Sequence, residues 1–287
     1  MSVSDNSLIE GGSDFSDSLF LVGFALSLSF VFVPLSMMDW FLSVFSILLI
    51  RYVVIAGLAF VLFYVVFKNR LSFRKIQTAF PKLTDYRREI VFSVITTGIF
   101  AIVAIIVFHP TGLRPYTLIY GELADFGPLY FVLSLIAILF IHDTYFYWMH
   151  RLMHSQFGMR YIHLIHHKST NPSPWAAFAF HPLEAVLEAG IIVVVVFALP
   201  VHAVTIIAFM IFMTIYNVYG HLGWELYPKG FHKTWIGRWV NTSVNHNLHH
   251  KRFTGNYGLY FLIWDRLLGT LREDYDETYE EVTQRVI

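Results

Sequence analysis

The chain has 287 residues and no net charge at neutral pH; 56% of its residues are hydrophobic and only 14% are charged. Soluble domains carry about 25% charged residues, so this composition indicates a protein that lies largely within a membrane. Zero net charge provides no electrostatic attraction for nucleic acid, which we exclude as a partner. The lack of cysteine excludes disulfides, thiolate zinc sites and iron–sulfur clusters, leaving His, Asp and Glu as the strong metal ligands.

Residues 1–17 contain no Lys or Arg and predict a disordered N-terminal tail rather than a signal peptide. Long apolar runs follow, and a run of about 20 such residues can cross a bilayer as a helix. The candidate membrane spans are residues 18–38, 41–67, 89–108 and 127–141 and the two halves of 185–219, which Pro200 separates. This pattern predicts an all-α fold, an integral membrane helical bundle.

The charges of the loops predict the orientation of the bundle. The loop 68–88 contains seven Lys and Arg residues, whereas the loop 109–126 contains only Arg114. Because Lys and Arg remain on the cytoplasmic side, the loop 68–88 is expected there. A helix from about Pro128 then returns to the cytoplasm, and the apolar hairpin 183–219 enters and leaves on that same side. The polar segments between and after these helices are therefore expected to form a cytoplasmic cap.

Three short stretches in those polar segments are rich in histidine: "HRLMH" at 150–154, "HLIHH" at 163–167 and "HNLHH" at 246–250. Residues three or four apart share one face of a helix, so each stretch predicts a claw of imidazoles. A lone histidine is usually structural, but burying so many imidazoles without a shared ligand would be costly. The predicted metal ligands are His150, His154, His163, His166, His167, His246, His249 and His250. Eight imidazoles exceed what one ion accepts, so we expect two ions with four or five nitrogens each.

Other residues near these stretches are candidates for supporting roles. His221, after the returning hairpin, is predicted to be a ninth ligand. Asp143 precedes His150 by seven residues and is placed to orient an imidazole. The residues expected to support the ligands without being assigned as ligands are Asp143, His142, His181, Asn217 and Glu184. Aromatic residues crowd the same stretches, but we expect most of them to belong to the core, and no substrate-binding residue is assigned.

The order HxxxH, HxxHH, HxxHH, with "DTYFYWMHRLMH" before it and "NYGLYFLIWDRLLGT" after it, resembles the fatty acid hydroxylase and sterol desaturase superfamily. The resemblance runs from about Leu133 to Leu271. The segment "HHKSTNPSPWAAFAFHPLEA" is most similar to the sterol C5-desaturase branch. The family's ligands fall on the eight histidines above, and His221 matches a later ligand. Some members have a further histidine four residues earlier, where this chain has Asn217.

The resemblance implies a non-haem di-iron centre, in which zinc can replace iron in purified protein, with O2 as co-substrate. The implied activity is hydroxylation or desaturation of a sterol or fatty-acyl lipid, and the residues leave both outcomes open. The chain has no Rossmann glycine fingerprint and no haem-attachment motif. A separate electron donor of the cytochrome b5 or ferredoxin type is therefore implied at the cytoplasmic face. Basic residues beside the boxes form a candidate docking face, namely Arg151, Arg160, Lys168, Lys251 and Arg252.

The sequence thus divides into a tail, transmembrane helices and loops at 18–126, a catalytic region at 127–271 and an acidic C-terminal tail at 272–287. Two alternatives to the oxidoreductase are a membrane metal transporter and a zinc-dependent membrane hydrolase. A membrane metal transporter would bind its ion near the bilayer midplane, whereas these histidines lie in polar segments. A zinc-dependent membrane hydrolase would need a general base, and no Glu lies within any of the three boxes.

Overall fold

The computed structural model describes residues 36–285. The predicted tail at 1–17 and most of the predicted span 18–38 lie outside these residues. The described chain is built almost entirely from helices, which confirms the predicted all-α class. Its only regular strands within the described range are two short segments at one end of the bundle.

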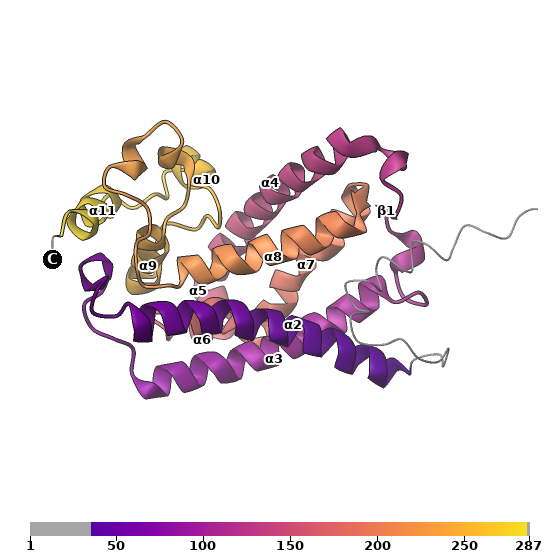
Figure 1. The fold of residues 1–287 in the computed structure, drawn as a ribbon, viewed down its shortest axis with the longest axis horizontal. Coiled ribbons are helices and arrows are strands. Elements are labelled where there is room, and N and C mark those ends of the chain that lie inside the picture. The colour runs from indigo at the N-terminus through magenta and orange to yellow at the C-terminus, as the bar shows by residue number, and fades with distance from the viewer. Residues whose placement is uncertain (1–35, 286–287) are drawn as a thin grey trace, which may run out of the picture.

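Within residues 36–285, five long helices make up the bundle (Figure 1). They are α2 (Met37–Phe60, continued by a π-helical segment Val61–Val66), α3 (Leu83–Phe108), α4 (Gly127–Met153), α7 (Pro182–Ala198) and α8 (Ala203–Gly220). Four of these helical stretches are long and apolar enough to cross a membrane: 37–66, 83–108, 127–153 and 203–220. Together with the composition, they identify an integral membrane protein.

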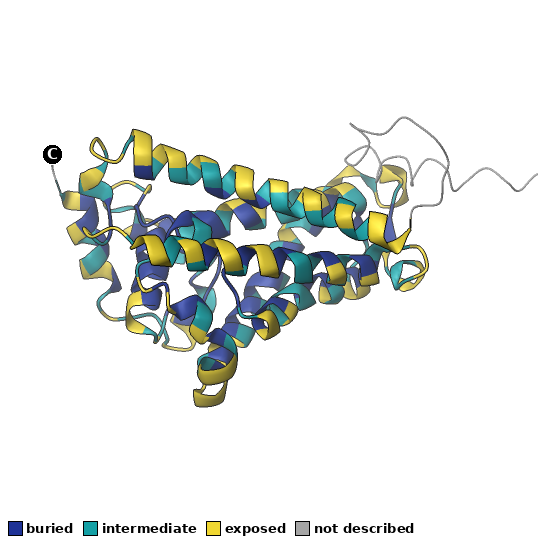
Figure 2. Ribbon diagram, turned by 90° about the horizontal axis from the view of Figure 1, so that it is seen from below, coloured by how far each residue is buried: buried dark blue, intermediate teal, exposed yellow. Residues whose placement is uncertain are grey.

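The outer faces of the long helices are exposed in the described part of the chain (yellow in Figure 2), and many of the exposed residues there are large and apolar. Leu58 on α2 is 58% exposed, Val91 on α3 is 55% exposed and Leu129 on α4 is 72% exposed. In water such a surface would be unfavourable, whereas hydrocarbon chains of lipid solvate it well. The exterior of the bundle is therefore suited to a bilayer.

The hairpin of α7 and α8 runs the length of the bundle. Strand β1 (Ile119–Tyr120) pairs in parallel with β2 (Val201–His202), with Ile119 opposite Val201. Because β2 lies at the turn between α7 and α8, that turn meets the loop 109–126. His181 and Pro182 start α7 at the opposite end, where the ring Nδ1 of His181 accepts a hydrogen bond from the Leu183 N–H. The hairpin thus enters and leaves at one end, as the sequence predicted.

The other end of the bundle carries a cap of short helices, seen opposite β1 in Figure 1. They are α5 (Gln156–Gly158), a π-helical turn Met159–His163, α6 (Leu164–His167), α9 (Ser243–Arg252), α10 (Ile263–Leu267) and α11 (Tyr275–Gln284). The basic loop joins this cap, since the Gln77 side chain donates to the Thr170 carbonyl and to Asn247. The loop rich in Lys and Arg and the histidine segments therefore share one end, as their charges predicted.

Helix α4 contains both the apolar run 127–141 and His150 of the first histidine box, and it ends at Met153 with His154 as its C-cap. One element differs from the sequence expectation. The C-terminal segment 272–287 is not a simple tail, because residues 275–284 form α11. Tyr275, Tyr279 and Val282 recur at helical spacing and pack, fully buried, against α9. Acidic residues lie between these three side chains and make the apolar spacing difficult to recognise in the sequence.

Candidate metal centre

All nine histidines predicted as ligands lie together in the cap, where the ends of α4, α6, α8 and α9 meet. They form two groups, and in each group one ring nitrogen from every histidine lies within 4.8 Å of those of the other members. The five-histidine group contains His150, His154, His163, His167 and His249, and the four-histidine group contains His166, His221, His246 and His250. The total and its division into five and four agree with the two ions expected from the sequence.

The structure corrects the expectation that each box acts as a single claw. His167 and His249 belong to the five-histidine group, whereas their chain neighbours His166 and His250 belong to the other. Successive residues on a helix point about 100° apart, so the two histidines of each HH pair face different centres. The spacing HxxHH therefore serves both groups at once and holds them next to each other.

Helix α9 shows how unusual this packing is. Its sequence SVNHNLHHKR is mostly polar, yet residues 243–250 are all buried. The Thr242 hydroxyl caps its first turn by accepting from the Asn245 N–H, and buried Glu225 accepts from the Val244 N–H. Burying so many polar side chains is costly unless they share a partner.

The imidazole nitrogens converge at distances that suit a metal ion. In the four-histidine group, Nε2 of His221 lies 3.0 Å from that of His246 and 3.1 Å from that of His250, and the latter two are 3.1 Å apart. In the five-histidine group, the Nε2 atoms of His150 and His163 are 3.1 Å apart. Two nitrogens at right angles, each about 2.1 Å from one ion, are separated by about 3.0 Å. The observed separations therefore fit the edges of coordination polyhedra.

Hydrogen bonds among the imidazoles alone cannot satisfy this arrangement. A neutral imidazole has one N–H, and that of His221 is at Nδ1, where it donates to the Asn217 carbonyl at 2.7 Å. Its Nε2 therefore offers only a lone pair, although two further Nε2 atoms lie within 3.1 Å. In the five-histidine group, the buried Nε2 of His154 has no hydrogen-bond partner among residues 36–285. A cation shared by these lone pairs meets the requirement of both groups.

Burial keeps these histidines in the neutral form that binds metal. It lowers the pKa of His154 and of His221 to about 4. The pKa values of His166 and His250 fall well below the usual range, because of burial first and neighbouring imidazoles second. Near neutral pH the groups therefore present lone pairs rather than positive charges.

Of the predicted supporting residues, two contact a histidine of the groups. Glu184, fully buried in the first turn of α7, accepts a 2.7 Å hydrogen bond from Nδ1 of His163. The main-chain oxygen of Asn217 accepts from His221, while its side chain donates to the Ala177 carbonyl at 2.7 Å. Glu184 therefore orients one imidazole through its carboxylate, and Asn217 orients another through its backbone.

The other three predicted supporting residues contact different partners. Asp143 binds the main chain instead of an imidazole: its Oδ1 accepts from the N–H groups of Leu259, Tyr260 and Phe261. The Nδ1 atom of His142 is 2.9 Å from the Tyr260 hydroxyl, outside both groups. His181 is the N-cap of α7. Asp143 thus holds a loop rather than a ligand.

Sequence reasoning missed the main-chain oxygens that follow the third box. Three carbonyl groups, those of Phe253, Gly255 and Tyr257, accept the Nδ1–H of histidines in the five-histidine group. Side-chain motifs give no direct sign of a carbonyl acceptor. The available signal was Gly255 followed by Asn256, two residue types that adopt left-handed backbone conformations.

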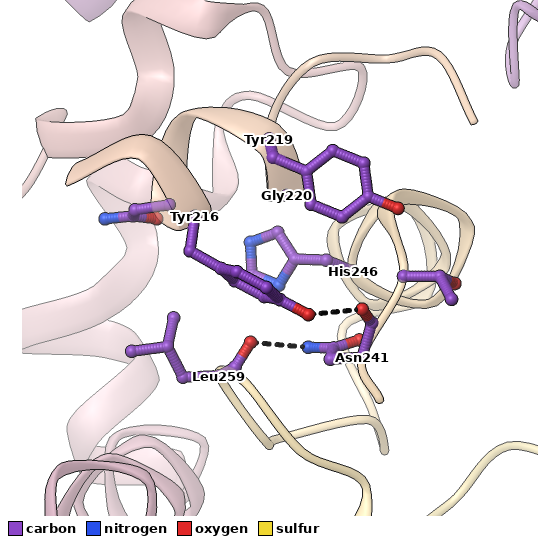
Figure 3. Close-up of a pocket in the computed structure, with 8 residues that line it drawn as sticks. Tyr216, Tyr219, Gly220, Asn241, His246 and Leu259 are labelled. Atoms are coloured by element: carbon purple, nitrogen blue, oxygen red, sulfur yellow. Dashed lines mark hydrogen bonds between the residues drawn. The ribbon is translucent and has the colours of Figure 1, made fainter. Parts of the chain in front are cut away.

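A small cavity of about 10 Å³ adjoins the four-histidine group, with room for about one water molecule. Figure 3 shows His246 at this cavity beside Tyr216, Tyr219 and Leu259. The Tyr216 hydroxyl donates to the Asn241 carbonyl at 2.6 Å, so the ring is held in place. Among the nine histidines, His246 is the one that lines this cavity.

Apolar helices long enough to cross a membrane end in a buried cluster of histidines, a combination typical of membrane proteins with histidine boxes. Residues 135–270 match the sequence model of the fatty acid hydroxylase family. This match includes all nine histidines and confirms the resemblance carried by the three boxes. The histidine-bearing region of the chain is thus similar to the fatty acid hydroxylase and sterol desaturase superfamily.

Curated relatives support the sterol desaturase branch within it. Lathosterol oxidase of Rattus norvegicus is 32% identical over 187 residues, which cover 64% of this chain and 60% of that protein. Lathosterol oxidase of Homo sapiens is 31% identical over 65% of this chain and 61% of its own length. A Delta(7)-sterol 5(6)-desaturase of Gibberella zeae is 31% identical, over 57% of this chain and 49% of that protein. The chain thus spans about 60% or less of these relatives, and no solved structure matches it.

Proposed function

We propose that this protein is a membrane-bound oxidoreductase that uses O2 and two iron ions to hydroxylate or desaturate a lipid of the sterol or fatty-acyl type. The convergence of nine neutral imidazoles as a group of five and a group of four carries this proposal. His150, His154, His163, His167 and His249 would hold one ion, and His166, His221, His246 and His250 would hold the other. When bound, two such ions supply the reduction of O2 needed to attack an unactivated C–H bond.

The chain's own residues bind, orient and shield this centre. The Glu184 carboxylate fixes the His163 ring with Nδ1 protonated and Nε2 directed inward. Aromatic rings cover the imidazoles, with Phe180 5.1 Å from the ring of His166 and Phe253 4.9 Å from that of His167. These rings exclude water, which strengthens the electrostatic interactions inside the site and protects reactive species.

The position of the centre suits a lipid substrate. His150 lies in the last turn of α4, His221 caps the end of α8, and Glu184 lies in the first turn of α7. A lipid entering between these helices would reach the histidines without leaving apolar surroundings. Because the relatives are lathosterol oxidases and Delta(7)-sterol 5(6)-desaturases, a sterol is the first substrate to test.

The overall reaction requires an external source of electrons. Hydroxylation places one oxygen atom of O2 in the lipid and releases the other as water. Desaturation removes two hydrogen atoms from the lipid and releases both oxygen atoms as water. Each reaction consumes two further electrons and two protons, which a separate donor protein of the cytochrome b5 or ferredoxin type would provide.

The donor would dock on the cap, which we place on the cytoplasmic side because it shares an end with the basic loop 68–88. The five basic residues expected to form the docking face are all exposed, namely Arg151, Arg160, Lys168, Lys251 and Arg252. We propose residues 127–271 as the catalytic unit, with α11 packed against its α9 helix. Residues 18–126 then serve as membrane-inserted scaffold.

The first experiment measures metal per chain by elemental analysis after anaerobic purification into lipid nanodiscs. The double variant His249→Ala, His250→Ala removes one imidazole from each group. Two irons in the parent chain and a clear reduction in the variant support the proposal. One metal or none in the parent, unchanged in the variant, would contradict it and favour the transporter alternative.

The second experiment supplies lathosterol, a reduced donor and O2 labelled with oxygen-18, followed by mass spectrometry of the sterol. Label in an alcohol indicates hydroxylation, whereas an unlabelled alkene indicates desaturation. Dependence on O2 also separates this proposal from a zinc hydrolase. A product formed equally well without O2 would reject the oxidative chemistry.

A further inference from the structure

The segment directly after α9 forms a row of hydrogen-bond acceptors for one group of histidines. We call residues 253–257 the carbonyl segment. Its alternate carbonyl groups, at Phe253, Gly255 and Tyr257, accept the Nδ1–H of His154 at 2.8 Å, of His249 at 2.7 Å and of His150 at 3.0 Å, respectively. Three of the five imidazoles in the five-histidine group therefore take their orientation from five consecutive residues.

The same carbonyl groups set the protonation pattern of those rings. A neutral imidazole carries its proton on one nitrogen, and an acceptor at Nδ1 places the proton there. Nε2 of His150, His154 and His249 is then left with its lone pair facing the centre of the group. Without the acceptors, each ring could turn or take the other tautomer, and the lone pair would no longer point inward.

The backbone of the carbonyl segment has a conformation that its sequence does not favour by itself. Phe253 has φ of 66°, Gly255 has φ of 74° and Asn256 has φ of 57°. Left-handed conformations are uncommon for residues other than glycine and persist only where surrounding contacts enforce them. Two of these three residues are not glycine. The surroundings must therefore hold the segment in place.

Asn256 holds the middle of the segment with hydrogen bonds to two other parts of the chain. It is fully buried, and its side chain donates to the Asn245 carbonyl on α9 at 3.1 Å and accepts from the Arg272 N–H at 2.8 Å. Its own N–H donates to the Thr270 carbonyl at 2.9 Å. The Asn256 side chain thus links the carbonyl segment to α9, which carries the third histidine box, and to Arg272 in the loop before α11.

Two further contacts hold the ends of the segment. Buried Asp265 accepts from the Tyr257 N–H at 2.9 Å and from the Gly258 N–H at 2.8 Å. The Arg272 guanidinium donates to the Thr254 carbonyl at 3.2 Å from the surface side. A surface hollow of about 370 Å³, lined by Thr254, Gly255 and Tyr257 among others, lies on this side. The carbonyl segment is therefore the wall between solvent and the five-histidine group.

We propose that Asn256 is a positioning residue for the metal ion of the five-histidine group alone, acting through the carbonyl segment on His150, His154 and His249. This inference rests on the proposed function, because it assumes that each group binds an ion. No described hydrogen bond joins the segment to His166, His221, His246 or His250. Loss of the Asn256 side chain should therefore weaken binding of the five-histidine ion and leave binding of the four-histidine ion unchanged.

The test uses Asn256→Gly, which permits the left-handed backbone but removes both side-chain hydrogen bonds. The substitution is made in two backgrounds. His221→Ala disables the four-histidine group and reports on the five-histidine ion, whereas His163→Ala does the reverse. Metal release from the full chain in nanodiscs to a chelator in excess is followed by absorbance. Release should become about tenfold faster or more in the His221→Ala background and remain unchanged in the His163→Ala background.

The matched control is Asn247→Ala, which removes another buried asparagine of the same region. Its side chain accepts from Gln77 and does not contact the carbonyl segment. It should alter release in neither background. Equal acceleration by Asn247→Ala and Asn256→Gly would overturn the proposal, as would an effect of Asn256→Gly confined to the His163→Ala background.

If Asn256→Gly releases both ions because the cap unfolds, Arg272→Ala decides the question. This substitution removes the Thr254 contact from a partly exposed side chain and leaves Asn256 intact. Faster release in the His221→Ala background alone supports the proposal, and equal change in both backgrounds rejects it. A parent chain that binds no metal would instead contradict the proposed function, so the two failures are distinguishable.

Discussion

The two histidine groups differ in what orients their imidazoles. In the five-histidine group, four rings donate from Nδ1 to acceptors outside their own helices: Glu184 and the three oxygens of the carbonyl segment. In the four-histidine group, His221 donates to a carbonyl of α8, the helix that it caps. The Nδ1 atoms of His166 and His250 are buried without a hydrogen-bond partner among the described residues.

This difference suggests different roles for the two proposed ions. Partners that orient a ligand ring typically contribute 10-fold to 100-fold to metal affinity. We therefore expect the five-histidine group to bind its proposed ion tightly. The four-histidine group is less constrained, and its member His246 lines a cavity of about 10 Å³. We expect the four-histidine ion to be the one that exchanges more readily.

The largest effect is expected from His221→Ala. The His221 Nε2 atom lies within 3.3 Å of Nε2 in each of the other three members, so it is central to its group. Its loss leaves three imidazoles, whereas His154→Ala removes the half-buried member of the five-histidine group and leaves four buried ones, among them His163, which is oriented by Glu184 and whose loss therefore disables the group. Elemental analysis should find one ion in the first variant and two in the second.

His202→Ala serves as the control for this pair, because His202 lies at the opposite end of the bundle and bonds the Gly121 carbonyl. It should retain both ions. If His154→Ala and His221→Ala lost metal equally, the two groups would not differ in the way that their hydrogen bonds indicate.

The next effect concerns the order in which metal leaves the parent chain. Chelation should release the ions in two phases whose rates differ about tenfold or more, because only one group has its rings fixed by external acceptors. The His163→Ala variant should keep the fast phase, and the His221→Ala variant should keep the slow one. A single phase would indicate that the two groups release metal at the same rate. A slow phase that belongs to the four-histidine group would indicate the opposite order of release.

A smaller effect is expected when one orienting partner is weakened. Glu184→Gln keeps the size of the side chain but replaces the carboxyl group that accepts from Nδ1 of His163 with an amide. The affinity of the five-histidine ion should fall about tenfold, while the four-histidine ion is retained. Titration with iron under anaerobic conditions measures both values.

Glu188→Gln is the matched control, since Glu188 lies one turn along the same helix α7. It removes a carboxylate from the same helix without touching the His163 bond. Should it reduce affinity as much as Glu184→Gln does, the effect would arise from charge within α7 and not from orientation of the ring.

The clustering of the histidines could be predicted from sequence, because helix geometry enforces the direction of residues at this spacing. His150 and His154, or His246 and His250, are four apart and must share a face. The assignment of neighbouring residues to different groups, as for His166 and His167, follows from the same geometry but requires knowing where the second centre lies. That information comes from tertiary packing, which the local pattern does not contain.

Contacts between residues that are distant in sequence could not be predicted from the local sequence pattern. Asp143 was expected to orient an imidazole because of its spacing from His150, yet it binds the N–H groups of a loop that is distant in sequence. The acidic stretch that forms α11 was interpreted as a tail, because Tyr275, Tyr279 and Val282 are separated by charged residues. In both cases the local structure depends on contacts with residues elsewhere in the sequence: Asp143 contacts the loop at Tyr260, and α11 packs against α9.

The smallest difference between the groups is expected in their response to acid. Burial lowers the pKa of His154 and of His221 to about 4 in the folded, metal-free chain, whereas an unfolded histidine titrates near 6.5. Between these values the unfolded chain binds protons that the folded chain does not, so stability rises with pH there. This stabilisation is therefore fully present above about pH 6.5 and is lost as the pH falls towards 4. Thermal unfolding of metal-free protein should show this loss, and His154→Ala and His221→Ala should each reduce it to a similar extent. If only one substitution changed the acid response, the two groups would differ in their solvation as well as in the orientation of their rings.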